Sequence, residues 1–435
     1  MPPSKTSNAI AVLIAGIFSC ALAALAPPAD GATETVLYSF QNNGKDGLIP
    51  DANLVYINGF LYGTTEYGGD RNCYADGCGV IFSVSATTGA ETVLYRFRGA
   101  GLYRESTLPE SLIEAGGSLF GTTRAGGRRD AGVLFSFDPQ SLAFKQRYYF
   151  CNLYNCVDGQ DPNSGLLNSK GTLYGTTEDG PLDCEEGTSC GVAFSFDPKT
   201  QIETVLYTFC SQQNCTDGAY PEGGLLSVKG VLYGATGQGG TGSNCPYYEP
   251  YECGTVFSLD PSTGVESAIY SFCSQLNCAD GNGPNGNLIN LGQTLYGTTV
   301  NGGTSNLGTV FSLHSPNGHE TVLHSFGGNS DGAGPNGGLI EINGTFYGTT
   351  FHGGGSGCDY SEGCGTVFSV DPDTGAEAVV YSFCSQANCA DGAYPSGSLL
   401  SVNGTLYGVT QYGGSGSCVS GNEPNGCGTV FAITP

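Results

Sequence analysis

Short apolar runs of four to seven residues, each bounded by Gly, Pro, Asn or Asp, follow one another along most of the chain. The runs are rich in Val, Ile, Leu, Tyr, Phe and Thr, and such runs with such boundaries predict β-strands. Tight turns of the type Asp-Pro-Ser-Thr-Gly (260–264) and Val-Asn-Gly (402–404) join neighbouring runs as in antiparallel hairpins. No long helix is expected, because Gly interrupts every apolar run.

Four kinds of run recur, each seven times and always in the same cyclic order, and we name the predicted strands A to D. Strand A carries a small residue followed by Leu-Ile or Leu-Leu, at Leu54, Leu112, Leu166, Leu225, Leu288, Leu339 and Leu399. Strand B, Leu-Tyr-Gly-Thr-Thr or a variant, ends at Thr65, Thr123, Thr177, Thr236, Thr299, Thr350 and Thr410. Strand C, Gly-x-x-Phe, ends at Phe82, Phe135, Phe194, Phe257, Phe311, Phe368 and Phe431. Strand D, Glu-Thr-Val-Leu-Tyr-Ser-Phe or a relative, ends at Phe40, Phe97, Phe150, Phe209, Phe272, Phe326 and Phe383.

One repeat therefore predicts a four-stranded antiparallel sheet, and seven such sheets must stack to bury their faces. Radial stacking makes a β-propeller, and a linear β-solenoid is the alternative. The repeats begin with a lone strand D at 34–40 and end with strands A, B and C of the seventh unit at Pro435. The first strand is thus expected to complete the last sheet, and the capping units of a solenoid are not visible. We predict an all-β, seven-bladed β-propeller over residues 33–435.

Residues 1–32 have the pattern of a signal peptide and a short leader. Lys5 precedes an apolar run from Ala9 to Ala26, and Pro27-Pro28 follows. A transmembrane anchor is one alternative, and a lipid anchor at Cys20 is another, because Ile17-Phe18-Ser19-Cys20 resembles a lipobox in which Phe18 fits poorly. Nothing later in the chain is apolar enough to span a bilayer. We predict a secreted or otherwise extracytoplasmic protein without a transmembrane segment after signal removal.

The chain has 19 cysteines, and those after Cys20 fall into nine local couples. Their members lie five to nine positions apart and His is scarce, so disulfides are favoured over zinc sites. The predicted pairs are Cys73–Cys78, Cys151–Cys156, Cys184–Cys190, Cys210–Cys215, Cys245–Cys253, Cys273–Cys278, Cys358–Cys364, Cys384–Cys389 and Cys418–Cys427. No metal site and no cofactor are predicted.

Antiparallel order places the D–A and B–C connections on one face of the propeller and the A–B and C–D turns on the other. All nine couples fall in the D–A and B–C connections, so we call that side the looped face and the other the plain face. Variable loops on a rigid scaffold are the usual place for binding. Asp-Gly recurs in the D–A loops at Asp46, Asp158, Asp217, Asp280, Asp331 and Asp391. We interpret it as a turn whose carboxylate accepts backbone N–H bonds, with a calcium-binding ring as the alternative.

Composition excludes some ligand classes and singles out a few residues. The formal charge of −25 argues against nucleic acid and anionic membranes as partners. An arginine group assigned to the looped face is our candidate for an anionic ligand such as a uronate or sulfate, with a solvated surface as the alternative. Its members are Arg98, Arg104, Arg124, Arg128 and Arg129. Adjacent acidic pairs such as Glu178 and Asp179 are interpreted as solvated.

Two further features are candidates for ligand contact. The segment between Cys245 and Cys253 presents Tyr247, Tyr248 and Tyr251, whose rings suit stacking on sugars, although a rigid or adhesive loop has the same composition. His352 is the histidine placed on the looped face and is a candidate general base. His324 replaces a Tyr of strand D. No catalytic nucleophile is predicted.

The last repeat contains the motif Asn-Gly-Thr-Leu-Tyr-Gly-Val-Thr-Gln-Tyr-Gly-Gly (403–414) followed by Gly-Thr-Val-Phe (428–431). This motif resembles the GloVer tandem repeat of bacterial exported proteins. The resemblance covers residues 33–435 and implies an extracytoplasmic location without an assigned activity. The segment 254–264 also resembles a blade strand of quinoprotein-type propellers. The chain lacks both the docking Trp and the vicinal cysteines of those enzymes, so no cofactor is implied.

Together these features predict an exported, acidic, non-catalytic recognition or scaffold propeller. Its expected ligand is an extracellular glycan or a surface protein bound through the looped face, and a monomer is expected. A carbohydrate-active lyase or hydrolase that uses the central channel and His352 is one alternative. A purely structural cell-envelope protein is the other.

Overall fold

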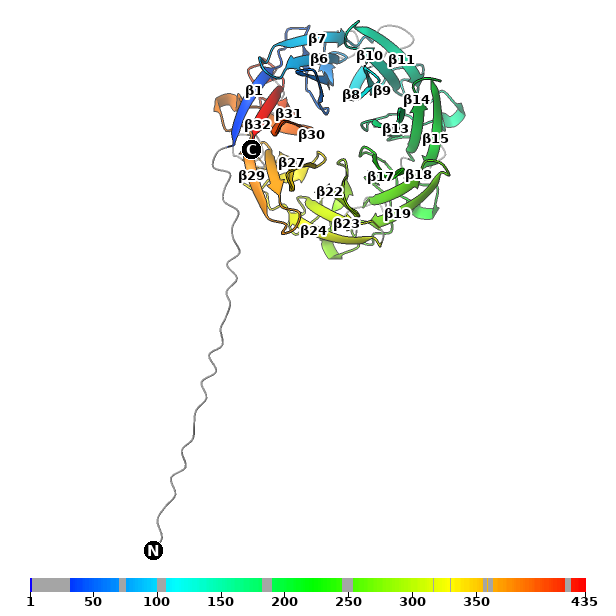
Figure 1. Cartoon of the computed structure of the whole chain (residues 1–435), viewed down its shortest axis with the longest axis vertical. Helices are drawn as coiled ribbons and strands as arrows, with labels where there is room; N and C mark the ends of the chain where they lie inside the picture. The colour runs from blue at the N-terminus through cyan, green and yellow to red at the C-terminus, as the bar shows by residue number, and fades with distance from the viewer. Residues whose placement is uncertain are drawn as a thin grey trace.

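The computed structural model describes residues 1, 32–69, 76–99, 107–181, 190–244, 253–315, 317–328, 330–354, 358, 363–418 and 424–435. These residues form seven antiparallel sheets arranged radially around a central axis (Figure 1). They contain single turns of 3-10 helix but no α-helix, and no helix among them is long and apolar enough to cross a membrane. The predicted seven-bladed β-propeller is confirmed. The expected signal peptide falls on residues 2–31, which lie outside the described residues.

Strand A lies nearest the axis in every blade and strand D lies outermost (Figure 1). Blade 1 consists of β3 (Val55–Ile57), β4 (Phe60–Thr65), β6 (Val80–Ser85) and β7 (Glu91–Arg96). Blade 2 consists of β8 (Thr107–Ala115), β9 (Ser118–Ala125), β10 (Val133–Asp138) and β11 (Ala143–Tyr149). Blade 3 consists of β12 (Leu167–Ser169), β13 (Thr172–Thr177), β14 (Val192–Asp197) and β15 (Ile202–Thr208). Blade 4 consists of β16 (Leu226–Val228), β17 (Val231–Thr236), β18 (Thr255–Asp260) and β19 (Val265–Ser271). Blade 5 consists of β20 (Asn282–Pro284), β21 (Ile289–Leu291), β22 (Thr294–Asn301), β23 (Thr309–His314) and β24 (His319–Ser325). Blade 6 consists of β25 (Ala333–Pro335), β26 (Ile340–Ile342), β27 (Thr345–His352), β28 (Thr366–Val370) and β29 (Glu377–Ser382). Blade 7 consists of β30 (Ala393–Val402), β31 (Thr405–Tyr412), β32 (Thr429–Thr434) and β1 (Thr33–Ser39). A short ribbon is formed by β2 (Gly47–Leu48) and β5 (Tyr67–Gly68). The described residues also include the 3-10 turns η1 (Tyr154–Cys156), η2 (Gln213–Cys215), η3 (Leu276–Cys278) and η5 (Ala387–Cys389).

The ring closes through its first strand. β1 pairs antiparallel with β32, so the sheet of blade 7 has the order β1-β32-β31-β30 and combines both ends of the folded chain (Figure 1). The register runs from Thr33 opposite Thr434 to Ser39 opposite Thr429. The predicted completion of the last blade by the first strand is therefore confirmed.

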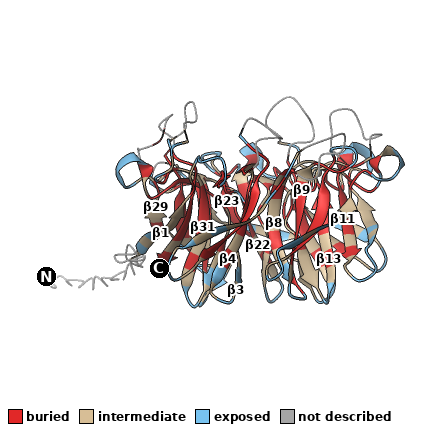
Figure 2. Ribbon diagram, turned by 90° about the horizontal axis from the view of Figure 1, so that it is seen from above, coloured by how far each residue is buried: buried red, intermediate tan, exposed pale blue. Residues whose placement is uncertain are grey.

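Phenylalanine pairs join each blade to the next. The Phe that follows strand D packs against the Phe of strand C in the following blade, with ring centroids 4.8–5.5 Å apart and rings steeply inclined. This contact occurs at all seven interfaces, including Phe40 with Phe82 where the ring closes. The rings are buried, as is the interior of the strands in the side view of Figure 2. Inclined aromatic pairs stabilise beyond the burial of their area, so these pairs stabilise the contact between neighbouring blades.

The Gly of the Leu-Tyr-Gly-Thr-Thr string makes room for this aromatic core. It lies opposite the strand C Phe in the register, as Gly234 does opposite Phe257. A Cβ atom at this Gly would lie 2.5–2.8 Å from Cζ of that Phe in all seven blades. The Gly is therefore required by space within the sheet, and the repeat of the string reflects one packing solution used seven times.

Gly234→Ala is accordingly expected to lower the free energy of unfolding by about 1–3 kcal/mol, because the added methyl group overpacks the site against Phe257. Urea or thermal unfolding of the two proteins measures the difference. Ser267→Ala, on the exposed side of β19 in the same blade, is the matched control and is expected to change stability by less than about 0.5 kcal/mol. Equal effects of the two substitutions would contradict this packing account.

A second contact between blades joins Pro to Gly. The Gly before strand C of each blade lies against the Pro near the start of the strand A segment of the next blade, as Gly365 does against Pro395. A Cβ atom at these seven glycines would lie 2.4–2.6 Å from the Pro Cδ. Each blade therefore positions the start of the next blade's innermost strand, and with it the residues around the axis.

The pairing of strands C and D has a β-bulge in every blade, a feature that was not predicted from the sequence. In blade 1, Phe82 pairs with Val93 and Ile81 pairs with Tyr95, so Leu94 is the extra residue. Three consecutive apolar residues, Val-Leu-Tyr, break the alternation of strand D at this point. The bulge is what sets the direction of the strand D Tyr that follows it.

Candidate functional site

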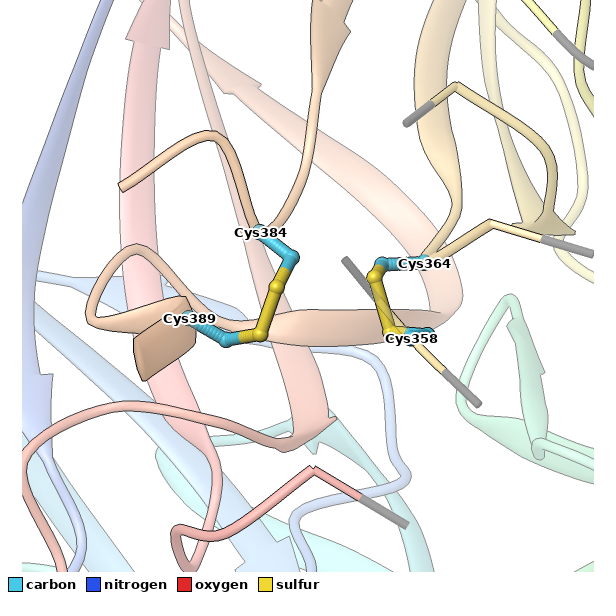
Figure 3. A group of neighbouring side chains, drawn as sticks. All are labelled: Cys358, Cys364, Cys384 and Cys389. Carbon is cyan, nitrogen blue, oxygen red and sulfur yellow. A yellow bond between two sulfur atoms is a disulfide. The ribbon is translucent and has the colours of Figure 1, made fainter. Parts of the chain in front are cut away.

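Disulfides from two connections of the same blade meet on the looped face. In blade 6, the Cys358–Cys364 bond of the B–C loop lies beside the Cys384–Cys389 bond of the D–A loop (Figure 3). All four sulfur atoms lie within 4.8 Å of one another. Cys253 packs in the same manner against Cys273 and Cys278 in blade 4. Both connections therefore reach the same face.

The structure forms six of the predicted disulfides between described residues: Cys151–Cys156, Cys210–Cys215, Cys273–Cys278, Cys358–Cys364, Cys384–Cys389 and Cys418–Cys427. Cys78, Cys190 and Cys253 are also disulfide-bonded. Their predicted partners Cys73, Cys184 and Cys245 lie outside the described residues. Because two cystines occupy neighbouring loops, they hold the base of the looped face in place.

The Asp-Gly carboxylates act as turn acceptors, as the sequence predicts. Asp217 accepts the backbone N–H groups of Ser211 and Gln212 and the Tyr207 hydroxyl, at 2.7–3.3 Å. Asp46, Asp158, Asp280 and Asp391 have the same kinds of partner. At Asp331 the Tyr hydroxyl is replaced by His324 Nε2, which lies 3.1 Å from Oδ1.

A glutamate from the next blade completes each of these six groups, which we call the interface triads. The residues are Tyr38, Asp46 and Glu91; Tyr148, Asp158 and Glu203; Tyr207, Asp217 and Glu266; Tyr270, Asp280 and Glu320; His324, Asp331 and Glu377; and Tyr381, Asp391 and Glu34. In all six, burial and then the Asp carboxylate raise the pKa of the Glu from its ordinary 4.5 to about 7 or 8. At the interface of blades 1 and 2, Phe144 takes the Glu position and stacks on Tyr95 with centroids 4.2 Å apart.

The axial channel opens on the looped face in a polar mouth built from repeated positions. Two positions in each blade form this mouth: the residue after the Pro of strand A and the residue after the last Thr of strand B. They lie close together because the register places this Pro opposite this Thr, as in Pro109 and Thr123. The first set is Asp51, Glu110, Asn163, Glu222, Asn285, Asn336 and Ser396. The second set is Glu66, Arg124, Glu178, Gly237, Val300, Phe351 and Gln411. A cavity of about 110 Å³ lies on the axis and is lined by residues of all seven blades.

One half of the mouth is charged and is organised around Arg124. The Arg124 guanidinium lies 3.2 Å from Asp161, 3.5 Å from Glu178 and 4.0 Å from Glu110. Glu110 belongs to the same blade as Arg124, whereas Asp161 and Glu178 belong to the next. The arginine therefore bridges blades 2 and 3 and is neutralised by several carboxylates.

Hydrogen bonds extend this charged half across further blades. Glu178, only 8% exposed in its side chain, accepts from Asn163 Nδ2 at 2.6 Å and from the hydroxyl of Tyr220 in blade 4. Asp51 accepts from the Ser396 hydroxyl and from Gln411 Nε2 of blade 7. The interpretation of Glu178 as solvated is thus wrong, because the ring brings residues of neighbouring blades around it.

The carboxyl groups at the mouth hold protons more tightly than free ones. Burial, and then the Asp51 carboxylate, raise the pKa of Glu110 well above its ordinary 4.5. Burial and the Glu178 carboxylate raise the pKa of Glu222 to about 7. For Arg124, burial opposes the charge, but Asp161 and Glu110 outweigh it and raise the pKa. Near neutral pH the mouth therefore offers both carboxyl donors and carboxylate acceptors.

The other half of the mouth, in blades 5 to 7, is uncharged and partly aromatic. Phe351 stacks on Tyr394 with centroids 4.8 Å apart, and Tyr412 meets Tyr394 edge-on at 6.0 Å. The His352 ring contacts both Phe351 and Tyr394. Two pockets of about 310 Å³ flank the mouth, one beside Glu222 in blades 4 and 5 and one beside Tyr412 between blades 7 and 1.

The predicted arginines lie in separate surroundings. Arg124 lies at the mouth, whereas the Arg128 guanidinium lies 5.5 Å above the Tyr149 ring on the outer strand. Arg129 Nη1 lies 3.4 Å from the carbonyl oxygen of Leu153, and Arg98 is exposed after β7. His352 lies in the aromatic half. Arg104, Tyr247, Tyr248 and Tyr251 fall outside the described residues.

Sequence reasoning missed most of the mouth. Asp51, Glu110 and Glu222 follow the same Pro in three blades, and Glu66 follows the last Thr of strand B as Arg124 does. Aligning the seven repeats and comparing the residues at these two positions is the signal that finds them. Acidic residues at these positions occur only in blades 1 to 4, whereas blades 5 to 7 have Asn, Ser, Val, Phe and Gln there.

The chain is similar to one protein family and to several solved structures. A family model described as the Gloeobacter/Verrucomicrobia repeat matches residues 26–248 and 244–435. No curated protein matches the sequence. Among solved structures, the computationally designed Ika8 protein aligns with a TM-score of 0.46 and 11% identity over 91% of this chain and 99% of that one. TolB from Acinetobacter baumannii aligns with a TM-score of 0.39 and 8% identity over 70% and 60%. The tricorn protease aligns with a TM-score of 0.40 and 11% identity over 77% of this chain and 26% of that one.

Proposed function

The chain belongs to the Gloeobacter/Verrucomicrobia repeat family, and from this premise and the geometry of the mouth we propose an exported, non-catalytic recognition propeller. Its ligand is the end of an extracellular glycan, bound where the axial channel opens on the looped face. The observation that carries the proposal is the convergence of carboxyl, amide and hydroxyl side chains on one cavity that is lined by residues of all seven blades. Export is supported by the leader sequence and by the number of disulfides.

The chemistry of the mouth favours a neutral or amino sugar. Sugar hydroxyls both donate and accept, and they match a site that holds protonated and ionised carboxyl groups side by side. Asn285 and Asn336 line the same cavity, and their Oδ1 atoms have no hydrogen-bond partner among the described residues. A uronate or sulfate fits less well, because the Arg124 guanidinium is already surrounded by the carboxyl groups of Asp161, Glu178 and Glu110.

Binding of the purified protein to an array of neutral, amino and acidic glycans, followed by titration calorimetry, tests the proposal. Glu222→Gln and Asn336→Ala each remove one polar contact and are expected to weaken binding by about 10-fold, since a hydrogen bond contributes about 1 kcal/mol or more. Glu341→Gln, at an exposed residue on the plain face, is the matched control and is expected to leave binding unchanged. Absence of glycan binding, or equal loss in the control, would overturn the proposal.

A carbohydrate-active enzyme is the second candidate, favoured by one observation. Glu222, with its pKa near 7, adjoins other carboxyl groups in an open cavity, and glycoside hydrolysis uses a protonated and an ionised carboxyl group together. Incubation with the bound glycans and analysis for new reducing or unsaturated ends separates the two functions. Under our proposal no new ends appear. Ends that appear with the native protein and not with Glu222→Gln would favour the enzyme.

A further inference from the structure

One interface triad differs from the other five in a way that changes its chemistry. His324 stands in β24 of blade 5 where the others have Tyr, while Asp331 and Glu377 keep the positions shared by all six. Nε2 or Nδ1 of His324, one carboxylate oxygen of Asp331 and one of Glu377 lie within 4.8 Å of one another. We infer that these three side chains form a binding site for a divalent transition-metal ion between blades 5 and 6.

The exchange of a phenol for an imidazole is what turns a structural triad into a metal site. A neutral phenol with a pKa near 10 is a poor ligand, whereas imidazole is a common ligand of zinc, copper, iron and nickel. Two carboxylates and one imidazole make a three-ligand set of the kind that leaves other positions to water. Calcium is disfavoured, because it takes six to eight oxygen ligands.

The three ligands are held by separate parts of the fold and remain reachable from solvent. Asp331 accepts the Gly327 N–H at 2.5 Å, and the His324 ring packs edge-on against Phe326 with centroids 4.9 Å apart. Oε1 of Glu377 has no hydrogen-bond partner among the described residues. The side chains of His324 and Asp331 are 20% and 26% exposed, which admits water as a further ligand.

The geometry requires only a small adjustment. Ligand atoms at about 2.0–2.2 Å from a bound ion lie roughly 3–4 Å from one another, close to the separations present here. His324 Nε2 and Asp331 Oδ1 are already 3.1 Å apart. A carboxylate oxygen of Glu377 already lies within 4.8 Å of both ligand atoms, so a bound ion links β29 of blade 6 to β24 of blade 5.

The fold contains its own control for this site. His324→Tyr recreates the triad found at five other interfaces, so it is expected to fold and to lose only the metal. Tyr270→His makes the reverse change at Asp280 and Glu320 and is expected to create a second site. His314 and His319 are paired across β23 and β24. The parent protein and both variants therefore carry His314→Gln and His319→Gln, which remove this surface pair.

The experiment titrates the purified, metal-free proteins with Co²⁺ and with Zn²⁺, following visible Co²⁺ absorption, bound zinc per chain and the thermal unfolding temperature, with Ca²⁺ as the comparison ion. We expect one equivalent of Zn²⁺ and a raised unfolding temperature in the parent, loss of that equivalent in His324→Tyr, and one further equivalent in Tyr270→His. Ca²⁺ is expected to leave the unfolding temperature of the parent no higher than that of His324→Tyr. Equal metal content and equal spectra for the parent and His324→Tyr would overturn the inference.

Discussion

Removal of β1 is expected to destroy the closed ring. A chain lacking residues 33–40 loses the six paired positions between β1 and β32 and the buried Phe40 that packs against Phe82. Truncation of one buried Phe costs about 3–5 kcal/mol, and the lost strand pairing adds to this. Because proteins of this kind are stable by only about 5–15 kcal/mol, most of the deleted protein is expected to be unfolded or aggregated through the open edge of β32.

Circular dichroism during heating and size-exclusion chromatography measure this loss. A synthetic peptide of residues 32–42, added to the deleted protein, is expected to restore the ring by occupying the vacated edge. The same peptide with Phe40→Ala is the matched control and is expected to restore much less, since it cannot fill the pocket beside Phe82. A deleted protein that unfolds at the temperature of the full chain would show that closure does not depend on β1.

Stability is also expected to fall as the pH rises from about 5 to 8.5. Burial and a neighbouring Asp raise the pKa of Glu34, Glu91, Glu203 and Glu266 from 4.5 to about 7, and that of Glu320 to about 8. The folded protein then binds more protons than the unfolded chain between these values. The stability that these groups contribute is full below pH 4.5, declines as the pH rises from there, and is lost once the pH exceeds their folded pKa near 7 to 8. Exposure of these groups to solvent limits the effect to roughly 1 kcal/mol each.

Thermal unfolding at pH 5.5 and at pH 8.5 measures this dependence. Glu266→Gln mimics the protonated group, so it is expected to raise the unfolding temperature by about 1–2 °C at pH 8.5 and by less at pH 5.5, where only part of the contribution of Glu266 is lost. Asp373→Asn, an exposed group in a C–D turn, is the control and is expected to change neither value. A protein that is more stable at pH 8.5 than at pH 5.5 would contradict the role assigned to the interface triads.

The architecture follows from sequence to an unusual extent, because each blade repeats the same local solution. The runs that end at Thr65 and Phe82 predict strands, and the lone run ending at Phe40 predicts how the ring closes. The bulge at Leu94 escapes prediction, since it depends on how strands C and D pair rather than on either run alone. The roles of the Phe, Gly and Pro positions likewise become clear only once neighbouring blades are in contact.

The site is less predictable for the same physical reason. Arg124 and Glu178 are 54 positions apart and meet because two blades adjoin, and Asp51 meets Gln411 across the closure of the ring. The crowding of Arg124, Arg128 and Arg129 in sequence suggested one patch, but Arg128 lies over Tyr149 of the outer strand and Arg129 lies beside Leu153 of the D–A loop. Proximity along the chain was therefore a poor guide to proximity around the axis.

The division of the mouth into a charged and an uncharged half has a consequence for anything that enters along the axis. Seven identical blades would offer an incoming molecule seven equivalent rotational settings, and a bound complex would be a mixture of them. Here the acidic blades 1 to 4 and the amide and aromatic blades 5 to 7 remove that degeneracy. A molecule that enters along the axis of this pseudosymmetric scaffold therefore has one preferred rotational orientation.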